Sequence, residues 1–198
     1  MAIIDIATRL SRGIRVFTLD TGWLPDETHG MMETVRERYG IEVEMVRPDA
    51  EEVRQLVAPH GSDLFYRSVE DRLSCCEVRK VRPLERKLAT LSAWATGIRR
   101  GQSPSRANTP KVELTAHPVK INPLADWTLA QVDDYTRTHG VPVHPLYARG
   151  YTSIGCAPCT RPILPGEDPR AGRWWWERDA QKECGIHFGP DGKVRRVA

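Results

Sequence analysis

The 198-residue sequence has no long hydrophobic run, no internal repeat and no low-complexity tract. Without a run of about 18 or more apolar residues, it has no candidate for a membrane-spanning helix. No basic stretch followed by an apolar one opens the chain, so we expect no secretory signal peptide.

The sequence also has no long block of charges of one sign. Its 29 Lys and Arg residues are interspersed with 26 Asp and Glu residues, for a net charge of +3. This mild balance argues against nucleic-acid binding. The length is enough to bury one core. We therefore expect a single domain over residues 1–198, with a mobile C-terminal tail over residues 185–198.

Cysteine is scarce, and the five residues make an odd count. An odd count fits poorly with the disulfide framework of a secreted domain. Cysteines that bind a metal or act in catalysis, in a reducing compartment, fit better. We therefore expect a cytoplasmic protein.

Strand and helix patterns alternate along the first half of the chain. This alternation predicts an α/β fold with a doubly wound, mostly parallel sheet. The predicted helices are 1–10, 26–39, 50–58, 80–88 and 128–139, and the predicted strands are 14–19, 41–46, 91–96 and, at the sheet edge, 119–121. Residues 99–111 are predicted to form a mobile loop, and the chain after Pro142 is predicted to be irregular.

Two loops follow predicted parallel strands, where ligands bind in open sheets. Asp20-Thr21-Gly22 follows the first strand, and Thr96-Gly97 follows the third. Their glycines would let a ligand approach the backbone closely. Ordinary tight turns are the alternative interpretation.

Four cysteines form two pairs, Cys75-Cys76 and Cys156-Ala157-Pro158-Cys159. The second spacing lets two thiolates reach one metal centre. Adjacent cysteines would be strained as joint ligands of one small ion, whereas a [4Fe–4S] cluster offers each thiolate a separate iron. The pattern favours that cluster, with a zinc site or four buried free thiols as alternatives.

The fifth cysteine lies in the sequence Glu183-Cys184-Gly185-Ile186-His187. A lone cysteine near a histidine in polar surroundings is a candidate nucleophile, with an incidental surface thiol as the alternative.

Basic residues flank both cysteine pairs. Lys80 follows Cys76 by four residues, which places both on one face of a helix. Guanidinium groups suit the bidentate capture of phosphate or sulfate, although a solvated surface is the alternative. The arginines concerned are Arg99, Arg100, Arg106, Arg161, Arg170 and Arg173. Trp174-Trp175-Trp176 is interpreted as a core or docking stripe.

Together these motifs resemble those of the assimilatory adenylyl-sulfate (APS) reductases, the thioredoxin-dependent, iron–sulfur branch of the APS/PAPS reductase family. The matching segments are Leu19–Gly22, Cys75–Leu84, Trp94–Gly97, Gln102–Pro104, Gly155–Pro162, Gly172–Glu177 and Lys182–His187. The resemblance implies an adenine-nucleotide alpha-hydrolase-like (Rossmann-like) fold with an irregular C-terminal segment.

The resemblance also implies an activity, the reduction of APS to sulfite and AMP in assimilatory sulfate reduction. Cys184 would form an S-sulfocysteine, which a separate thioredoxin would resolve. The implied ligands of a [4Fe–4S] cluster are Cys75, Cys76, Cys156 and Cys159. The implied phosphosulfate-binding residues are Lys80, Arg106, Arg170 and Arg173, the implied adenosine contacts are Leu19, Thr21 and Gly97, and His187 would lie near the substrate.

One part of the family pattern is absent. The family carries an upstream strand and a Ser-rich anion loop before the helix predicted at residues 1–10, so the resemblance implies a truncated or divergent form. The alternatives are a PAPS reductase, a non-catalytic binding module stapled by a four-cysteine metal site, and an inactive copy. The oligomeric state stays open, a homo-oligomer included.

Overall fold

The computed structural model describes residues 1–114, 118–177, 187–188 and 194–195. The helices are α1 (Ala2–Leu10), α2 (Asp26–Tyr39), α3 (Ala50–Val57), α4 (Val69–Cys76), α5 (Arg82–Leu88) and α6 (Leu129–Thr138). The strands are β1 (Val16–Leu19), β2 (Val43–Val46), β3 (Ala93–Ala95), β4 (Val112–Glu113), β5 (Val119–Ile121), β6 (His187–Phe188) and β7 (Val194–Arg195). The predicted α/β class is confirmed. None of the described helices is long and apolar enough to cross a membrane.

The two main sheets are built on parallel pairs, as the alternating pattern predicts. β1 pairs with β2, from Val16 opposite Val43 to Leu19 opposite Val46. β3 pairs in parallel with β5. In the part of the chain that the structure describes, no ladder joins β1 to β3, so the sheets are separate.

The prediction of an edge strand at residues 119–121 is wrong. β5 is the central strand of its sheet, because β4 pairs with its other side in antiparallel fashion. β4 has only two residues and follows a polar loop, so its sequence carries no strand signal. Lys120 of β5 and Glu113 of β4 form an ion pair at 2.9 Å, and Lys120 is buried by this pairing.

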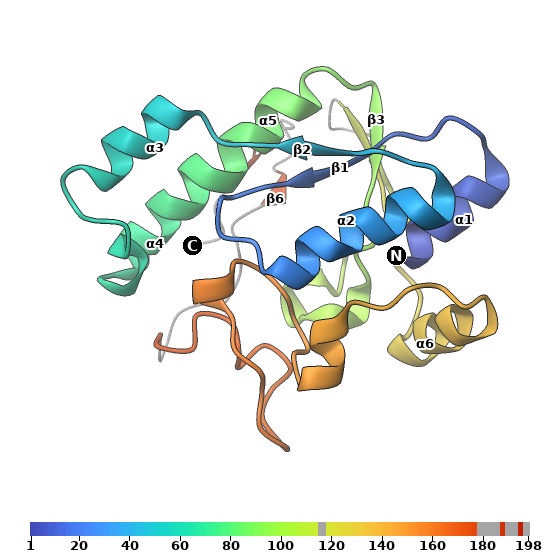
Figure 1. Ribbon diagram of the computed structural model, residues 1–198. Helices are drawn as coiled ribbons and strands as arrows, with labels where there is room; N and C mark the ends of the chain where they lie inside the picture. The colour runs from blue at the N-terminus through green and yellow to red at the C-terminus, as the bar shows by residue number, and fades with distance from the viewer. Residues whose placement is uncertain (115–117, 178–186, 189–193, 196–198) are drawn as a thin grey trace.

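Helices lie on both sides of the β1–β2 pair. Figure 1 shows α2 on one side and the α4–α5 rod on the other. Local signals set the ends of two predicted helices. α2 ends at Gly40, whose φ of 64° is left-handed, and Thr128 caps α6 in a capping box with Gln131.

The helix predicted at residues 80–88 begins much earlier. Ser68 caps α4 by accepting a hydrogen bond from the backbone N–H of Asp71. A π-helical stretch, Glu77–Val81, then joins α4 to α5, so the rod runs from Val69 to Leu88. The predicted loop at residues 99–111 contains two short 3-10 turns, and the Arg100 side chain donates to the Thr109 carbonyl at 2.9 Å.

The buried residues beside the two cysteine pairs include aromatic rings, whereas other buried positions, such as Val35, Leu84 and Leu88, are aliphatic. One buried cluster contains Leu64, Phe65, Cys75, Cys156, Cys159 and Trp174. From the end of α6 to Glu177 the chain folds as irregular segments with short 3-10 turns, as predicted, whereas β6 and β7 further on form a two-stranded antiparallel pair. The irregular segments lie at the bottom of Figure 1, below the start of α2.

Candidate active site at four buried cysteines

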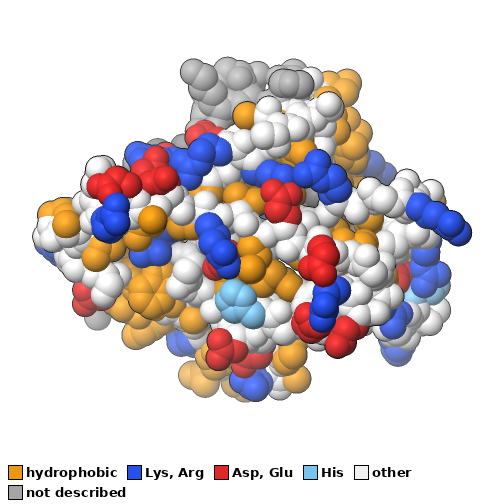
Figure 2. All heavy atoms as spheres, turned by 45° about the horizontal axis from the view of Figure 1, so that its top comes forward, with side chains coloured by type: hydrophobic (Ala, Val, Ile, Leu, Met, Phe, Trp, Pro, Cys, Tyr) orange, Lys and Arg blue, Asp and Glu red, His pale blue; other side chains and the backbone are white. Residues whose placement is uncertain are grey.

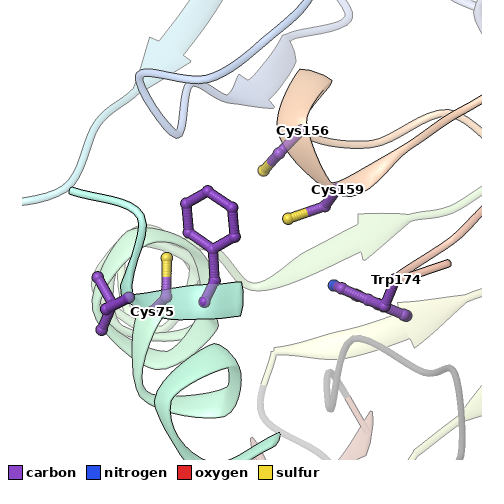
Figure 3. Packing of buried hydrophobic residues seen from close by; sticks show 6 residues of the cluster. Cys75, Cys156, Cys159 and Trp174 are labelled. Carbon is purple, nitrogen blue, oxygen red and sulfur yellow. The ribbon is translucent and has the colours of Figure 1, made fainter. Parts of the chain in front are cut away.

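The fold brings the two cysteine pairs together across about 80 residues of sequence. Cys75 and Cys76 end α4, and Cys156 and Cys159 enclose a 3-10 turn. All four are buried and none forms a disulfide. Figure 3 shows the sulfurs of Cys156 and Cys159 pointing from this turn toward the helix that carries Cys75. One small cavity is lined by all four cysteines together with Trp23, Phe65, Arg72, Arg79, Lys80 and Pro158.

Hydrogen bonds hold the turn between Cys156 and Cys159. The Thr160 hydroxyl donates to the Cys156 carbonyl at 2.9 Å, and the Trp174 N–H donates to the Cys159 carbonyl at 3.1 Å. The Ala157 N–H donates to the Trp23 carbonyl at 2.7 Å. The turn is therefore fixed to the segment that follows β1.

The loop after β1 is also tied directly to the cysteines. The Thr21 hydroxyl lies 3.3 Å from Sγ of Cys156. Arg79 donates to the Thr21 carbonyl at 2.9 Å, and its guanidinium lies over the Trp23 ring. Arg79 is a residue that sequence reasoning missed. Its position inside the segment from Cys75 to Lys80 was the available signal.

Burial is the largest influence on the pKa of Cys75 and on that of Cys159. Burial raises the pKa of Cys75, and Cys156 raises it further, while Arg79 and Lys80 oppose the rise. Burial and the neighbouring Cys156 raise the pKa of Cys159 to about 12, against the effect of Lys80. A metal centre would have to displace these protons, and the adjacent cations favour the thiolate forms.

The donor set suits a metal centre with thiolate ligands. The cavity offers four thiols and no carboxylate or imidazole. Within the described ranges, no three His, Cys, Asp or Glu side chains converge closely enough to hold one metal ion. Thiolates bind zinc as well as the irons of a cluster, so the chemistry of the four thiols fits either kind of centre.

Apart from the arginines and His187, the predicted substrate residues differ in how close they lie to the cysteine cavity. Lys80 lines the cysteine cavity from the π-helical stretch, and Thr21 lies beside it. Leu19 ends β1, next to this loop. Gly97 follows β3 in the other sheet and is not among the residues that line the cavity.

The three predicted anion-binding arginines differ in their surroundings. Arg106 is half-buried in the loop after β3, where it donates to the Gln102 side chain at 2.7 Å. Arg170 is half-buried. Arg173 is buried behind the Cys156–Cys159 turn, with its guanidinium over the Trp174 ring and a hydrogen bond of 3.3 Å to the Ile154 carbonyl. Their contacts with a substrate stay predictions.

Comparisons with known proteins agree with this geometry. The model of the phosphoadenosine phosphosulfate reductase domain family matches residues 1–162. This chain belongs to that family. It is 56% identical over 183 residues to adenosine 5'-phosphosulfate reductase of Burkholderia cepacia, covering 90% of this chain and 73% of that protein. It is 50% identical over 189 residues to the enzyme of the same name from Allochromatium vinosum, covering 94% and 74%.

The solved structures support the same family. The phosphoadenylyl-sulfate (PAPS) reductase of Candida auris, determined as a phosphate complex, superposes with a TM-score of 0.63 at 27% identity, covering 79% of this chain and 75% of that one. This likeness confirms the predicted adenine-nucleotide alpha-hydrolase-like fold.

The tail of this family member is described only in part. Cys184 lies outside the described residues, so its predicted role is untested. The backbone of His187 belongs to β6, which pairs in antiparallel fashion with β7. The rest of the predicted mobile tail also lies outside the described ranges.

The three consecutive tryptophans, Trp174, Trp175 and Trp176, differ in their burial. Trp174 is completely buried, and Trp176 packs against the same core cluster, whereas Trp175 is 48% exposed. The prediction of a core role is therefore confirmed for Trp174 and Trp176.

Proposed function

We propose that this protein is an adenylyl-sulfate reductase, an oxidoreductase that converts APS to sulfite and AMP in assimilatory sulfate reduction. The observation that carries the proposal is the cavity lined by both cysteine pairs and by Lys80, beside the loop of Thr21. The relatives from Burkholderia cepacia and Allochromatium vinosum bear the corresponding name. A reducing compartment, the cytoplasm, suits the thiol chemistry.

The proposed reaction has two steps at sulfur. The Cys184 thiolate attacks the sulfur of APS, the bond from sulfur to the phosphate oxygen breaks, and AMP leaves with that electron pair. Cys184 then carries an S-sulfocysteine. A separate thioredoxin supplies the two electrons. One of its thiolates attacks Sγ of Cys184 and displaces sulfite, which leaves a mixed disulfide; its second thiolate attacks that disulfide, closes the thioredoxin disulfide and releases the Cys184 thiolate. Such exchange depends on the thiolate fraction of the attacking cysteine and on the quality of the leaving group.

The proposed resident cofactor is a [4Fe–4S] cluster held by Cys75, Cys76, Cys156 and Cys159. When bound, it would supply a fixed local charge beside the anion site rather than electrons. The residues of this chain do the binding: Lys80, Arg106, Arg170 and Arg173 hold the phosphosulfate. Leu19, Thr21 and Gly97 contact the adenosine, and His187 lies near the reacting end.

The proposed function is tested by intact-protein mass spectrometry after anaerobic incubation with APS, thioredoxin omitted. We expect an adduct of one SO3 group that peptide mapping assigns to Cys184. The matched control is Cys184→Ser, which keeps the iron and its visible absorbance and gains no adduct. A folded, iron-containing wild-type protein that gains no adduct contradicts the proposal. An adduct that forms faster with PAPS than with APS favours a PAPS reductase instead.

A further inference from the structure

Asn122 follows β5 directly and is completely buried. It lies where the carboxyl ends of β3 and β5 meet, because the Thr96 N–H extends the β3–β5 pairing by donating to the Ile121 carbonyl at 2.9 Å. In sheets of parallel strands, ligands bind beyond these ends. A buried amide costs free energy unless its polar atoms find partners, so the partners of Asn122 indicate what it holds in place.

The Asn122 side chain connects the two ends of the loop between β3 and β4. Its Oδ1 accepts a hydrogen bond of 2.6 Å from the hydroxyl of Thr96, which comes directly after β3. Its Nδ2 donates to the Pro110 carbonyl at 2.9 Å and to Oε1 of Glu113 at 3.0 Å. Because a carbonyl and a carboxylate paired with Lys120 can only accept, these bonds fix which end of the amide faces Thr96.

The Thr96 hydroxyl connects Asn122 to the backbone around Gly97. The hydroxyl donates its only proton to Asn122 and accepts the Ile98 N–H at 3.4 Å, so its two bonds hold the residues on either side of Gly97. Gly97 is exposed. Apart from the adjoining residues, the nearest described atom to a Cβ placed on Gly97 is a methyl carbon of Ile3 at 4.0 Å. The Gly97 backbone is therefore fixed in position and still open to a ligand.

Backbone hydrogen bonds already join the three strands of this sheet, and the Asn122 N–H adds one to the Lys111 carbonyl at 2.7 Å. The pairing of the strands therefore does not depend on the Asn122 side chain. What the side chain adds is the connection through Thr96 to Gly97, which is proposed above to contact adenosine. A loop that is ordered before the ligand arrives does not have to be ordered during binding, and this saves affinity.

We propose that Asn122, acting through the Thr96 hydroxyl, is a positioning residue that holds the Gly97 backbone for the nucleoside part of the substrate. This inference rests on the proposed function. Asn122 itself takes no part in the chemistry at sulfur.

The test measures two quantities in the iron-loaded protein: the affinity for AMP, by isothermal titration calorimetry, and single-turnover adduct formation from APS. Thr96→Val removes the hydroxyl and keeps the branched shape, whereas Thr96→Ser keeps the hydroxyl. Asn122→Ala removes the amide, and is made alone and together with Thr96→Val. Thr90→Val is the matched control, because the exposed Thr90 hydroxyl donates to the Lys87 carbonyl at the end of α5.

We expect Thr96→Val to raise the dissociation constant of AMP roughly 3- to 10-fold, the usual effect of one lost hydrogen bond. The APS concentration for half-maximal adduct rate should rise by the same factor at an unchanged maximal rate, because the nucleoside contact is the same in the ground state and the transition state. Thr96→Ser and the control should bind AMP within about twofold of wild type. Adding Thr96→Val to Asn122→Ala should weaken AMP binding no further, because the two residues act in series.

Several outcomes decide against the inference. Equal losses of AMP affinity in Thr96→Val and Thr96→Ser would show that the hydroxyl has no such role, and this comparison holds even where Asn122→Ala fails to fold. Effects of Asn122→Ala and Thr96→Val that multiply in the double variant would show that the two residues act independently. A lowered maximal adduct rate at wild-type AMP affinity also overturns the inference. If wild type gains no adduct, the proposed function falls, and the inference with it; if wild type reacts and the variants match it in both measurements, the inference alone falls.

Discussion

The hydroxyl of Thr21 lies 3.3 Å from Sγ of Cys156, although 135 residues separate them in the sequence. Arg79 completes the connection by donating to the Thr21 carbonyl. The loop proposed to contact adenosine is therefore in contact with a proposed cluster ligand. Binding that orders one of these sites should favour the other by the same factor.

We expect Thr21→Val to weaken this connection, because valine keeps the branched shape of threonine and lacks its hydroxyl. The free energy of unfolding should fall by about 0.5–1.5 kcal/mol, the usual net value of one hydrogen bond. The visible spectrum of the iron-loaded protein should change, and AMP should bind less tightly. Thr21→Ser, which keeps the hydroxyl, is the control. An unchanged spectrum and AMP affinity in Thr21→Val would show that the hydroxyl has no such role.

Removing the Lys80 ammonium should weaken the handling of APS. A hydrogen bond to a charged group contributes about 1.5–3 kcal/mol, so kcat/KM for APS should fall roughly 10- to 100-fold in Lys80→Gln. Circular dichroism should confirm that the variant folds. Lys111→Gln is the control, since Lys111 lies in an exposed pair with Asp126. Wild-type kinetics in Lys80→Gln would remove Lys80 from the proposed anion site.

Two glycines beside the cysteine turn should respond differently to alanine. A Cβ at Gly172 would overlap the Arg161 carbonyl oxygen, a backbone atom, whereas a Cβ at Gly155 would overlap the Arg173 guanidinium, which can move. Gly172→Ala should therefore lower the free energy of unfolding by about 1–3 kcal/mol.

Gly155→Ala should lose less free energy of unfolding, because the Arg173 guanidinium can move away from the new Cβ. Since that movement displaces Arg173, we expect Gly155→Ala and Arg173→Gln to bind APS with similarly reduced affinity. Denaturant titration and APS binding measure the two effects. Gly30→Ala in α2, where a Cβ meets nothing within 4 Å, is the control and should stabilise slightly. Equal stability losses in Gly172→Ala and Gly155→Ala would contradict this reading of the turn.

Asp5 should make stability depend on pH in acid. Burial alone would raise its pKa, but hydrogen bonds from Tyr135, Arg9 and Tyr39 outweigh burial and hold the pKa below its ordinary value. The charged form is therefore favoured in the folded state. Its contribution is complete above the unfolded pKa of about 3.9 and is lost as the pH falls through the lower folded value.

Asp5→Asn should lower the free energy of unfolding by about 1–3 kcal/mol at neutral pH, because three donors lose a charged acceptor. The difference from wild type should shrink as the pH falls below about 4. Urea titrations across this range measure it. Glu33→Gln, in an exposed pair, should show almost no difference at any pH. A constant difference into acid would show that the Asp5 charge is not the cause.

The exposed charged side chains are mixed in sign, as are the charged residues along the sequence. On the face in Figure 2, Lys and Arg side chains alternate with Asp and Glu side chains, as the interspersed sequence predicts. The basic groups that matter for the proposed site are instead buried. Arg72, Arg79, Lys80 and Arg173 are each at most 9% exposed, and composition alone could not distinguish them from surface charges.

Features whose causes are local could be predicted from the amino-acid sequence alone. Gly40 and Thr128 mark helix ends because a left-handed residue and a capping hydroxyl act within one turn. The spacing within each cysteine pair is likewise local, and the alternation of strands and helices predicted parallel pairing. That the two pairs share one cavity follows from the fold.

Features that depend on partners distant in the sequence could be found only in the folded chain. β5 is central because β4, a strand of two residues with no sequence signal, pairs with it. Arg72 meets Glu177 across 105 residues, and Arg79 meets Thr21 across 58. No periodicity relates such residues. Their contacts arise because the chain buries charged side chains only where the fold supplies a partner or an aromatic face, and only the assembled core fixes where that is.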